Sequence, residues 1–311
     1  MYVHRLEDKN KLKSSVLTFG NFDGLHRGHL HLLDMLNIES LNSNLKSVVL
    51  TFSPHTNEVI PKSKVFNILT PFNVKKKLFL QNTKINYLCK ISFNEQFSKL
   101  TATEFIDLIV SKYNPQTILI GYDNYFGFKK EGSYNYLVNK EKYKNIKIIE
   151  INKFLEKGDI IKSSIIKSLI LNANIKKANL YLSRFYSIQG TVVEGEKKGL
   201  GLGFRTANIK LTNKKQLIPS NGVYSVNLLT DGIEYMSVCN IGFCPTIKMT
   251  KVKTVEVHVI DKEISLYGKD VEVQFISFLR IEKKFTSAEL LSSKIKEDIE
   301  RVKKERVITS G

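Results

Sequence analysis

The chain has 311 residues, of which 42% are hydrophobic and 25% are charged, and its formal net charge is +18. This composition is ordinary for a soluble globular protein with roughly two domains, and no apolar run approaches the ~18 residues of a membrane-spanning helix, so no membrane partner is expected. The basic charge raises the possibility of nucleic-acid binding, but the lysines are spread along the whole chain without a run of five like charges, so we expect no nucleic-acid partner.

A short buried strand, a glycine turn and a helix open the chain. Residues 16–19 favour a strand, residues 20–24 form a turn with two glycines, and apolar spacing predicts a helix from about residue 25. His26 and His29 share one face of the helix start, about 4.5 Å apart along its axis. Because a helix N-terminus attracts phosphate, two imidazoles beside it could bind a phosphate and stabilise charge that develops on it. Without the preceding strand and turn, two solvated surface histidines would be the simpler interpretation.

Strands and helices then alternate along the first half of the chain. We predict buried strands at 47–52, 85–91, 116–121 and 146–151, and helices at 71–81 and from residue 101, where Thr101 and Glu104 have capping-box spacing. This order predicts a doubly wound, mostly parallel sheet with helices on both faces. Ligands bind at the carboxyl ends of such strands, so the two histidines and the 121–132 loop are expected to converge on one site.

The pattern changes near residues 183–186, where we place the domain boundary. Alternating runs at 188–193, 223–229, 255–260 and 271–278, with a hairpin turn at 231–232, predict a small closed antiparallel barrel. An apolar stripe through residues 288–302 predicts a helix after the barrel. The predicted domains are therefore 1–183 and 184–311.

Three cysteines, an odd number, form no Cys-x-x-Cys pair, which indicates reduced thiols in the cytoplasm. Residues 1–10 carry no apolar core of the kind that a secretory signal needs. The sequence gives no indication of oligomeric state.

The run G-N-F-D-G-L-H-R-G-H at 20–29 resembles the His-x-Gly-His signature of nucleotidyltransferases. Its particular residues resemble those of bacterial bifunctional riboflavin kinase/FAD synthetases. The run at 121–127 resembles that family's Gly-x-Asp-Phe-x-Phe-Gly motif, with departures at Asn124 and Tyr125, where the family's usual arginine is missing. Residues 160–167 resemble Ile-Ser-Ser-Thr-x-Ile-Arg, with Lys162 in place of the first serine and Lys167 in place of the arginine.

Residues 190–208 contain a glycine-rich turn that could cradle phosphates, although a bare glycine-rich turn is weak evidence. Its continuation, G-F-R-T-A-N, resembles the riboflavin kinase signature Gly-Phe-Pro-Thr-Ala-Asn, with Arg205 in place of the proline. The family's catalytic carboxylate falls on Glu256, which on its own would read as a solvent-facing strand glutamate. The resemblance extends from about residue 13 to residue 303.

The resemblance implies a nucleotidyltransferase-type α/β domain followed by a riboflavin kinase-like barrel with a C-terminal helix. It implies that riboflavin is phosphorylated to FMN with ATP, and that FMN is adenylylated to FAD with a second ATP, with Mg²⁺ as the cofactor. A riboflavin kinase with a weakened adenylyltransferase domain is the first alternative. A basic nucleic-acid-binding protein without turnover is the second.

The resemblance also implies the site residues. The catalytic residues are His26, His29 and Glu256. Thr206 and Asn208 hold the metal, and Tyr224 and Arg280 bind the flavin. ATP is bound by Gly20, Asn21, Phe22, Asp23, Gly24, Asp123, Ser163, Ser164, Lys167, Gly195, Gly199, Gly203, Thr206 and Asn208.

Overall fold

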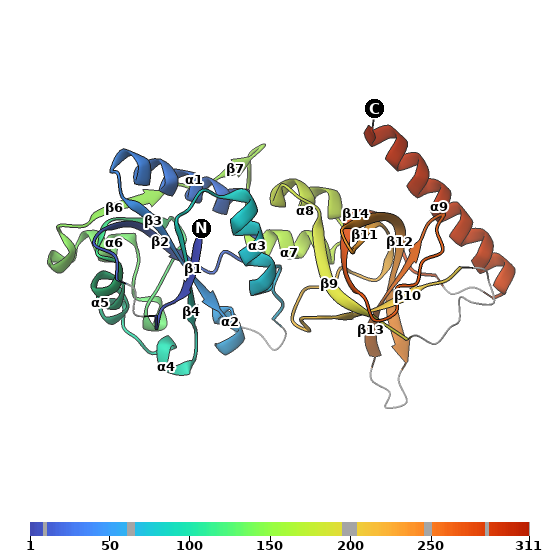
Figure 1. The fold of residues 1–311 in the computed structure, drawn as a ribbon, viewed down its shortest axis with the longest axis horizontal. Helices are drawn as coiled ribbons and strands as arrows, with labels where there is room; N and C mark the ends of the chain where they lie inside the picture. The colour runs from blue at the N-terminus through green and yellow to red at the C-terminus, as the bar shows by residue number, and fades with distance from the viewer. Residues whose placement is uncertain (9–10, 61–65, 195–203, 246–250, 284–285, 311) are drawn as a thin grey trace. The chain divides into compact units, whose positions relative to one another are not determined.

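The computed structural model describes residues 1–8, 11–60, 66–194, 204–245, 251–283 and 286–310, and it divides into two compact units, Met1–Ser163 and Ser164–Gly311 (Figure 1). Each unit is described by itself. Within these ranges, no helix has both the length and the apolar character that a membrane span requires.

The first unit is built on a six-stranded sheet in the order β1-β4-β3-β2-β5-β6, and every neighbouring pair is parallel. This confirms the predicted doubly wound sheet, and it adds an edge strand that the sequence did not indicate. The strands are β1 (Tyr2–Arg5), β2 (Ser15–Gly20), β3 (Lys46–Ser53), β4 (Tyr87–Ser92), β5 (Pro115–Gly121) and β6 (Lys147–Ile151).

Helices connect the strands from β2 onward, and a short hairpin follows β6. The helices are α1 (Arg27–Asn42), α2 (Thr56–Val59), α3 (Phe72–Asn82), α4 (Glu95–Ser98), α5 (Ala102–Tyr113), α6 (Tyr134–Val138) and the 3₁₀ turns η1 (Phe128–Lys130) and η2 (Glu141–Tyr143). The hairpin consists of β7 (Leu155–Glu156) and β8 (Asp159–Ile160), and α7 (Ser163–Leu171) begins at the last residue of the unit.

The central strand β2 sends alternate residues into two separate cores. Val16 packs with residues of α1 and α3, while Leu17 and Phe19 pack with residues of α5. The period of two along a strand therefore accounts for helices on both faces of the sheet. The chain reverses its direction of strand addition between β2 and β5, so the ends of these two strands form the switch point at which such sheets bind ligands.

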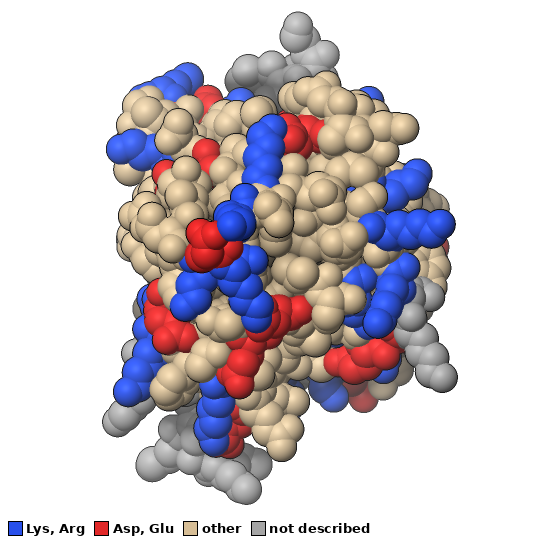
Figure 2. Space-filling view, turned by 90° about the vertical axis from the view of Figure 1, so that its left-hand side faces the viewer, with Lys and Arg blue, Asp and Glu red and all other residues tan. Residues whose placement is uncertain are grey.

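The face of the first unit drawn in Figure 2 carries basic and acidic side chains side by side. Elsewhere among the described residues of the first unit, ion pairs join Lys142 to Asp107 at 2.6 Å and Lys147 to Glu39 at 2.8 Å. The charge on this face is therefore interspersed, in agreement with the scattered lysines of the sequence.

The second unit is a closed barrel in the order β10-β13-β12-β11-β14-β9, with antiparallel neighbours throughout. This confirms the predicted barrel and its C-terminal helix. Its elements are α8 (Ile175–Leu182), β9 (Tyr186–Val193), β10 (Ala207–Leu211), β11 (Gly222–Thr230), β12 (Ile233–Pro245), β13 (Lys251–Val259), β14 (Asp270–Arg280) and α9 (Ala288–Ser310).

The predicted boundary near residues 183–186 differs from the division between the compact units, which lies between Ser163 and Ser164. The side chain of Asn179 in α8 donates to the Phe275 carbonyl of β14 at 2.8 Å and accepts from the Tyr186 amide of β9 at 2.7 Å. These contacts attach α8 to the barrel. Sequence periodicity could not reveal this, because the apolar spacing of a helix does not show which sheet the helix packs against.

The buried His4 of β1 makes the stability of the first unit depend on pH. Its Nε2 lies 2.9 Å from the Tyr113 hydroxyl, and burial lowers the pKa of His4, with Asp8 opposing and Lys112 adding to the shift. Below the ordinary histidine pKa near 6.5, the unfolded chain therefore binds more protons than the folded one, and the free energy of unfolding falls as the pH falls.

We expect the urea midpoint to drop less for His4→Asn than for the wild type between about pH 7.5 and pH 5.5. Equal drops would contradict this account.

Candidate functional site

The turn after β2 adopts a backbone conformation that most residues avoid. Phe22 and Leu25 have φ values of +47° and +39°, in the left-handed region that favours glycine. Hydrogen bonds from a distant loop hold the turn: Asp23 Oδ1 accepts from the Leu69 and Thr70 amides at 2.8 and 3.1 Å. The turn is therefore fixed by tertiary contacts.

The two predicted histidines meet at the start of α1. His26 is the N-cap, and its Nδ1 accepts from the His29 amide at 3.3 Å. The two rings stack, with centroids 3.6 Å apart and planes inclined by 15°. His26 is buried and His29 is half-buried. The pair thus places two stacked imidazoles at the positive end of a 16-residue helix, where negative charge is favoured.

The loop after β5 lies at the same end of the sheet. Asn124 donates to the Phe19 carbonyl of β2 at 2.7 Å, and Asp123 forms an ion pair with Lys162 at 3.0 Å. Hydrogen bonds to Tyr122 and Asp123 raise the pKa of Lys162. The lysine that departs from the family motif is therefore a cation held beside the predicted ATP residue Asp123.

Ser163 is tied directly to the turn, because its hydroxyl donates to the Asp23 carbonyl at 2.7 Å. Arg27 of α1 pairs with Glu156 of the β7–β8 hairpin at 2.5 Å and lies over the Phe154 ring. These contacts fix the segment before Ser163 against the first turn of α1. Ser164 and Lys167 belong to the second compact unit, and their contact with ATP stays a prediction.

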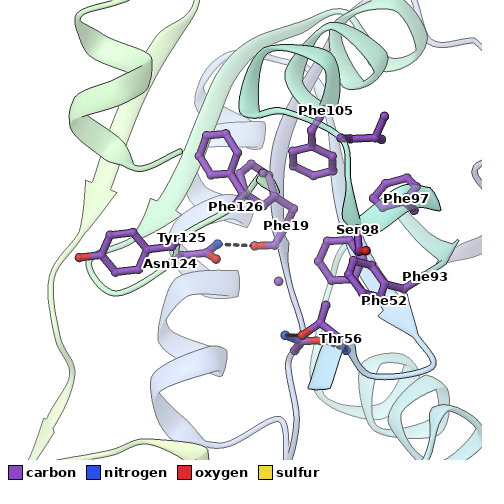
Figure 3. Close-up of a pocket in the computed structure, with 14 residues that line it drawn as sticks. Phe19, Phe52, Thr56, Phe93, Phe97, Ser98, Phe105, Asn124, Tyr125 and Phe126 are labelled. Atoms are coloured by element: carbon purple, nitrogen blue, oxygen red, sulfur yellow. Dashed lines mark hydrogen bonds between the residues drawn. The ribbon is translucent and has the colours of Figure 1, made fainter. Parts of the chain in front are cut away.

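An aromatic pocket opens beside the turn (Figure 3). Phenylalanine rings from the ends of several strands and from α5 form its walls, and Phe19 contacts Phe105 and Phe126 edge to face at centroid distances of 5.2 Å. The sequence did not predict this pocket, because apolar residues at strand ends cannot be told from core residues until the strands are placed together. Its lining residues are Phe19, Gly20, Asn21, Phe52, Thr56, Phe93, Phe97, Ser98, Leu100, Phe105, Asn124, Tyr125, Phe126 and Gly127.

The barrel brings together a second group of predicted residues. Asn208 of β10 stands opposite Glu256 of β13, and Glu256 stands opposite Asn240 of β12. Cross-strand partners project from the same face with Cβ atoms ~5 Å apart, so these three half-buried side chains form a polar row. Thr206, which is exposed, directly precedes β10. Gly195, Gly199 and Gly203 lie outside the described residues.

Comparisons with known proteins cover both units. A family model for FAD synthetase matches residues 8–165, and one for riboflavin kinase matches residues 182–305. The bifunctional riboflavin kinase/FMN adenylyltransferase of Buchnera aphidicola subsp. Schizaphis graminum is 36% identical over 97% of this chain and 96% of its own length. The Escherichia coli K12 protein of the same name is 33% identical over 95% and 94%. This chain belongs to the bifunctional riboflavin kinase/FMN adenylyltransferase family.

The family resemblance drawn from the sequence motifs is therefore confirmed. A solved structure titled as a macrolide-efflux protein from Streptococcus pneumoniae aligns with a TM-score of 0.85 and 27% identity, covering 96% of this chain and 97% of that one. Its title names a different activity, and the likeness to it concerns the fold.

In this member of the bifunctional riboflavin kinase/FMN adenylyltransferase family, the two predicted flavin residues of the barrel make internal contacts. Tyr224 is fully buried and donates to the Ser220 carbonyl at 2.6 Å. Arg280 clamps Asp298 of α9, with Nε 3.0 Å from both carboxylate oxygens and Nη2 2.8 Å from one. These contacts attach α9 to the barrel, and binding of flavin by the two residues stays a prediction.

The Arg280–Asp298 pair gives a stability prediction, because both side chains are largely buried. Removing one partner of a buried pair leaves an uncompensated charge, so Asp298→Ala is expected to lower the free energy of unfolding by about 3–5 kcal/mol. Urea unfolding followed by circular dichroism measures the change. Glu297→Ala, at the exposed neighbouring position, is the matched control. A loss no larger than the control's would show that the pair does not hold α9.

Proposed function

We propose that this chain phosphorylates riboflavin to FMN with ATP in its second domain, and adenylylates FMN to FAD with a second ATP in its first. The observation that carries the proposal is the stacked His26–His29 pair at the N-terminus of α1, beside an aromatic pocket at the same end of the sheet. A helix N-terminus with two imidazoles suits a phosphate, and a pocket walled by phenylalanine suits a flat flavin ring.

The pocket suggests how FMN lies during adenylyl transfer. Its lining includes Gly20 and Asn21, which begin the turn that leads to the histidines. A flavin ring among the phenylalanines can therefore direct its phosphate toward the turn. An oxygen of that phosphate attacks the α-phosphorus of ATP in line, the new P–O bond forms, and the bond to the leaving pyrophosphate breaks.

His26 and His29 would stabilise the charge that builds on the α-phosphate, and no covalent intermediate is needed. Ser163, fixed to the turn through the Asp23 carbonyl, and Asp123, paired with Lys162, would hold other parts of ATP. We assign Phe22, Gly24, Ser164 and Lys167 to ATP binding on the motif match alone.

In the barrel, Glu256 would take the proton of the riboflavin 5′-hydroxyl as the hydroxyl oxygen attacks the γ-phosphorus of ATP. The new P–O bond forms while the bond from the γ-phosphorus to the bridging oxygen breaks, and ADP leaves. General-base help of this kind is worth roughly 10²–10⁴ in rate. Asn208 is its cross-strand partner, so an amide oxygen for Mg²⁺ lies beside the base.

Thr206 and Asn208 offer a hydroxyl and an amide oxygen, hard donors that fit Mg²⁺. Over the described parts of the chain, no cluster of three or more His, Cys, Asp or Glu could hold a metal by itself. When bound, Mg²⁺ neutralises phosphate charge and orients the γ-phosphate.

The domains are taken as 1–183 and 184–311, and the start of the second is supported by the riboflavin kinase model, which begins at residue 182. The partners are riboflavin, FMN and ATP, with no nucleic acid, and the compartment is the cytoplasm.

His29→Ala tests the first site. We expect FAD formation from supplied FMN and ATP to fall by at least about 10²-fold, because a transition-state charge stabiliser is lost. FMN formation from riboflavin in the same sample should stay within twofold. His31→Ala, two residues along the same helix, is the matched control and should keep both activities. Chromatography of flavin products measures both reactions, and loss of both activities in folded His29→Ala protein would contradict the division of labour.

Glu256→Gln tests the second site. Riboflavin phosphorylation should fall roughly 10²–10⁴-fold, because the amide cannot accept the proton, whereas FAD formation from supplied FMN should be unchanged. Glu272→Gln, a half-buried strand glutamate of the same barrel, is the control. If the Glu256→Gln protein phosphorylated riboflavin at the wild-type rate, Glu256 would not be the general base of the reaction.

A further inference from the structure

A lysine lies buried beneath the turn that carries the histidine pair. Lys75 of α3 is only 3% exposed, although lysine is almost never fully buried without partners. Its Nζ donates to the Asn21 carbonyl at 2.6 Å and to the Thr51 hydroxyl at 3.3 Å. The lysine therefore joins α3 to the end of β3 and to the turn after β2.

Asn21 is held at both its main chain and its side chain. The Thr51 hydroxyl also donates to the Asn21 carbonyl at 3.3 Å, so two donors converge on one oxygen. The Asn21 amide group donates to the Thr56 hydroxyl at 2.9 Å, and its oxygen accepts from the Thr56 amide at 3.2 Å. Among these donors, Lys75 is the charged one, and charge-assisted hydrogen bonds are about twice as strong as neutral ones.

The turn needs such an anchor because its backbone is strained. Phe22 and Leu25, which follow Asn21, adopt left-handed angles that are unfavourable for residues other than glycine and persist only when the surroundings determine them. His26 comes next and caps α1. A shift of the Asn21 carbonyl is therefore passed along five residues to the histidine pair.

We infer that Lys75 is a positioning residue for adenylyl transfer, which holds the Asn21 carbonyl and thereby fixes the turn that places His26 and His29. The inference rests on the proposed function of this site. Lys75 is buried beneath the turn and bonds to Asn21 and Thr51, so we expect its loss to act through the position of the turn. A misplacement of about 1 Å at a reacting centre costs roughly 10²-fold in rate.

The test compares Lys75→Met with Lys76→Met in the full-length chain. Each variant removes one positive charge from α3, but Lys76 is exposed. For Lys75→Met we expect kcat for FMN adenylylation to fall about 10²-fold, with a change in the KM for ATP of less than about fivefold. Riboflavin phosphorylation in the same sample and both activities of Lys76→Met should stay within twofold. FMN adenylylation by Lys75→Met within twofold of Lys76→Met would overturn the inference.

A pH profile of the wild type provides a readout that does not depend on a folded variant. Burial lowers the pKa of Lys75 to about 8, while Asp23 of the turn and Glu58 of α2, the charged groups that face it, oppose the shift. The Lys75 ammonium therefore loses its charge within the range from about pH 7 to pH 9. The neutral amine still donates a hydrogen bond, but a weaker one.

We therefore expect kcat/KM for FMN adenylylation to fall severalfold through about pH 8, relative to riboflavin phosphorylation, and Lys75→Met to lack this step. A flat wild-type ratio across this range, or the same step in Lys75→Met, would overturn the inference. A wild-type chain that forms no FAD at all would instead overturn the proposed function of the site, so the two failures are distinguishable.

Discussion

The candidate nucleotide site of the first unit depends on one constraint, the fixing of a strained turn between β2 and α1. The turn contains left-handed residues that are not glycine, so local preference opposes its shape. Contacts from elsewhere supply the missing stability: Asp23 binds two amides of residues 69 and 70, Lys75 binds the Asn21 carbonyl, and Ser163 binds the Asp23 carbonyl. These contacts hold the turn in its strained conformation, and with it the stacked histidines at the N-terminus of α1.

The two units position their polar groups in different ways. In the first, the groups come from loops at the carboxyl ends of parallel strands, and each loop has to be fixed by separate hydrogen bonds. In the second, Asn208, Glu256 and Asn240 are neighbours because antiparallel register places them opposite one another. A closed barrel fixes register without further anchors, so a polar row on its surface is positioned by the sheet itself.

Departures from the family motifs are accommodated by local contacts. Lys162 stands where the family has serine, and it forms an ion pair with Asp123, which keeps a positive charge beside the predicted ATP residues. Arg205 stands where the family has proline, and its carbonyl lies 2.9 Å from Nδ1 of His258 on β13. A proline would present the same main-chain oxygen, so the contact that the substitution adds is the ion pair of the Arg205 guanidinium with Glu263 at 3.7 Å.

The sequence by itself determined the local elements and the family. The strand, glycine turn and two histidines were recognisable because they lie within 14 residues of one another, and the alternating runs of the second half predicted a barrel because strand periodicity is local. The burial of Lys75 also has a local signal, because this lysine lies on the same helix face as the apolar residues Val74, Leu78 and Phe79.

Only the tertiary structure decided what those elements do together. The Lys75–Asn21 bond joins residues 54 positions apart, and the aromatic pocket collects rings from the ends of β2 and β3, from the segments after β4 and β5, and from α4 and α5. The attachment of α8 to the barrel likewise depends on contacts with β14, 96 positions away. Hydrogen bonding and packing between distant segments depend on strand order and register, which no local pattern of residues records.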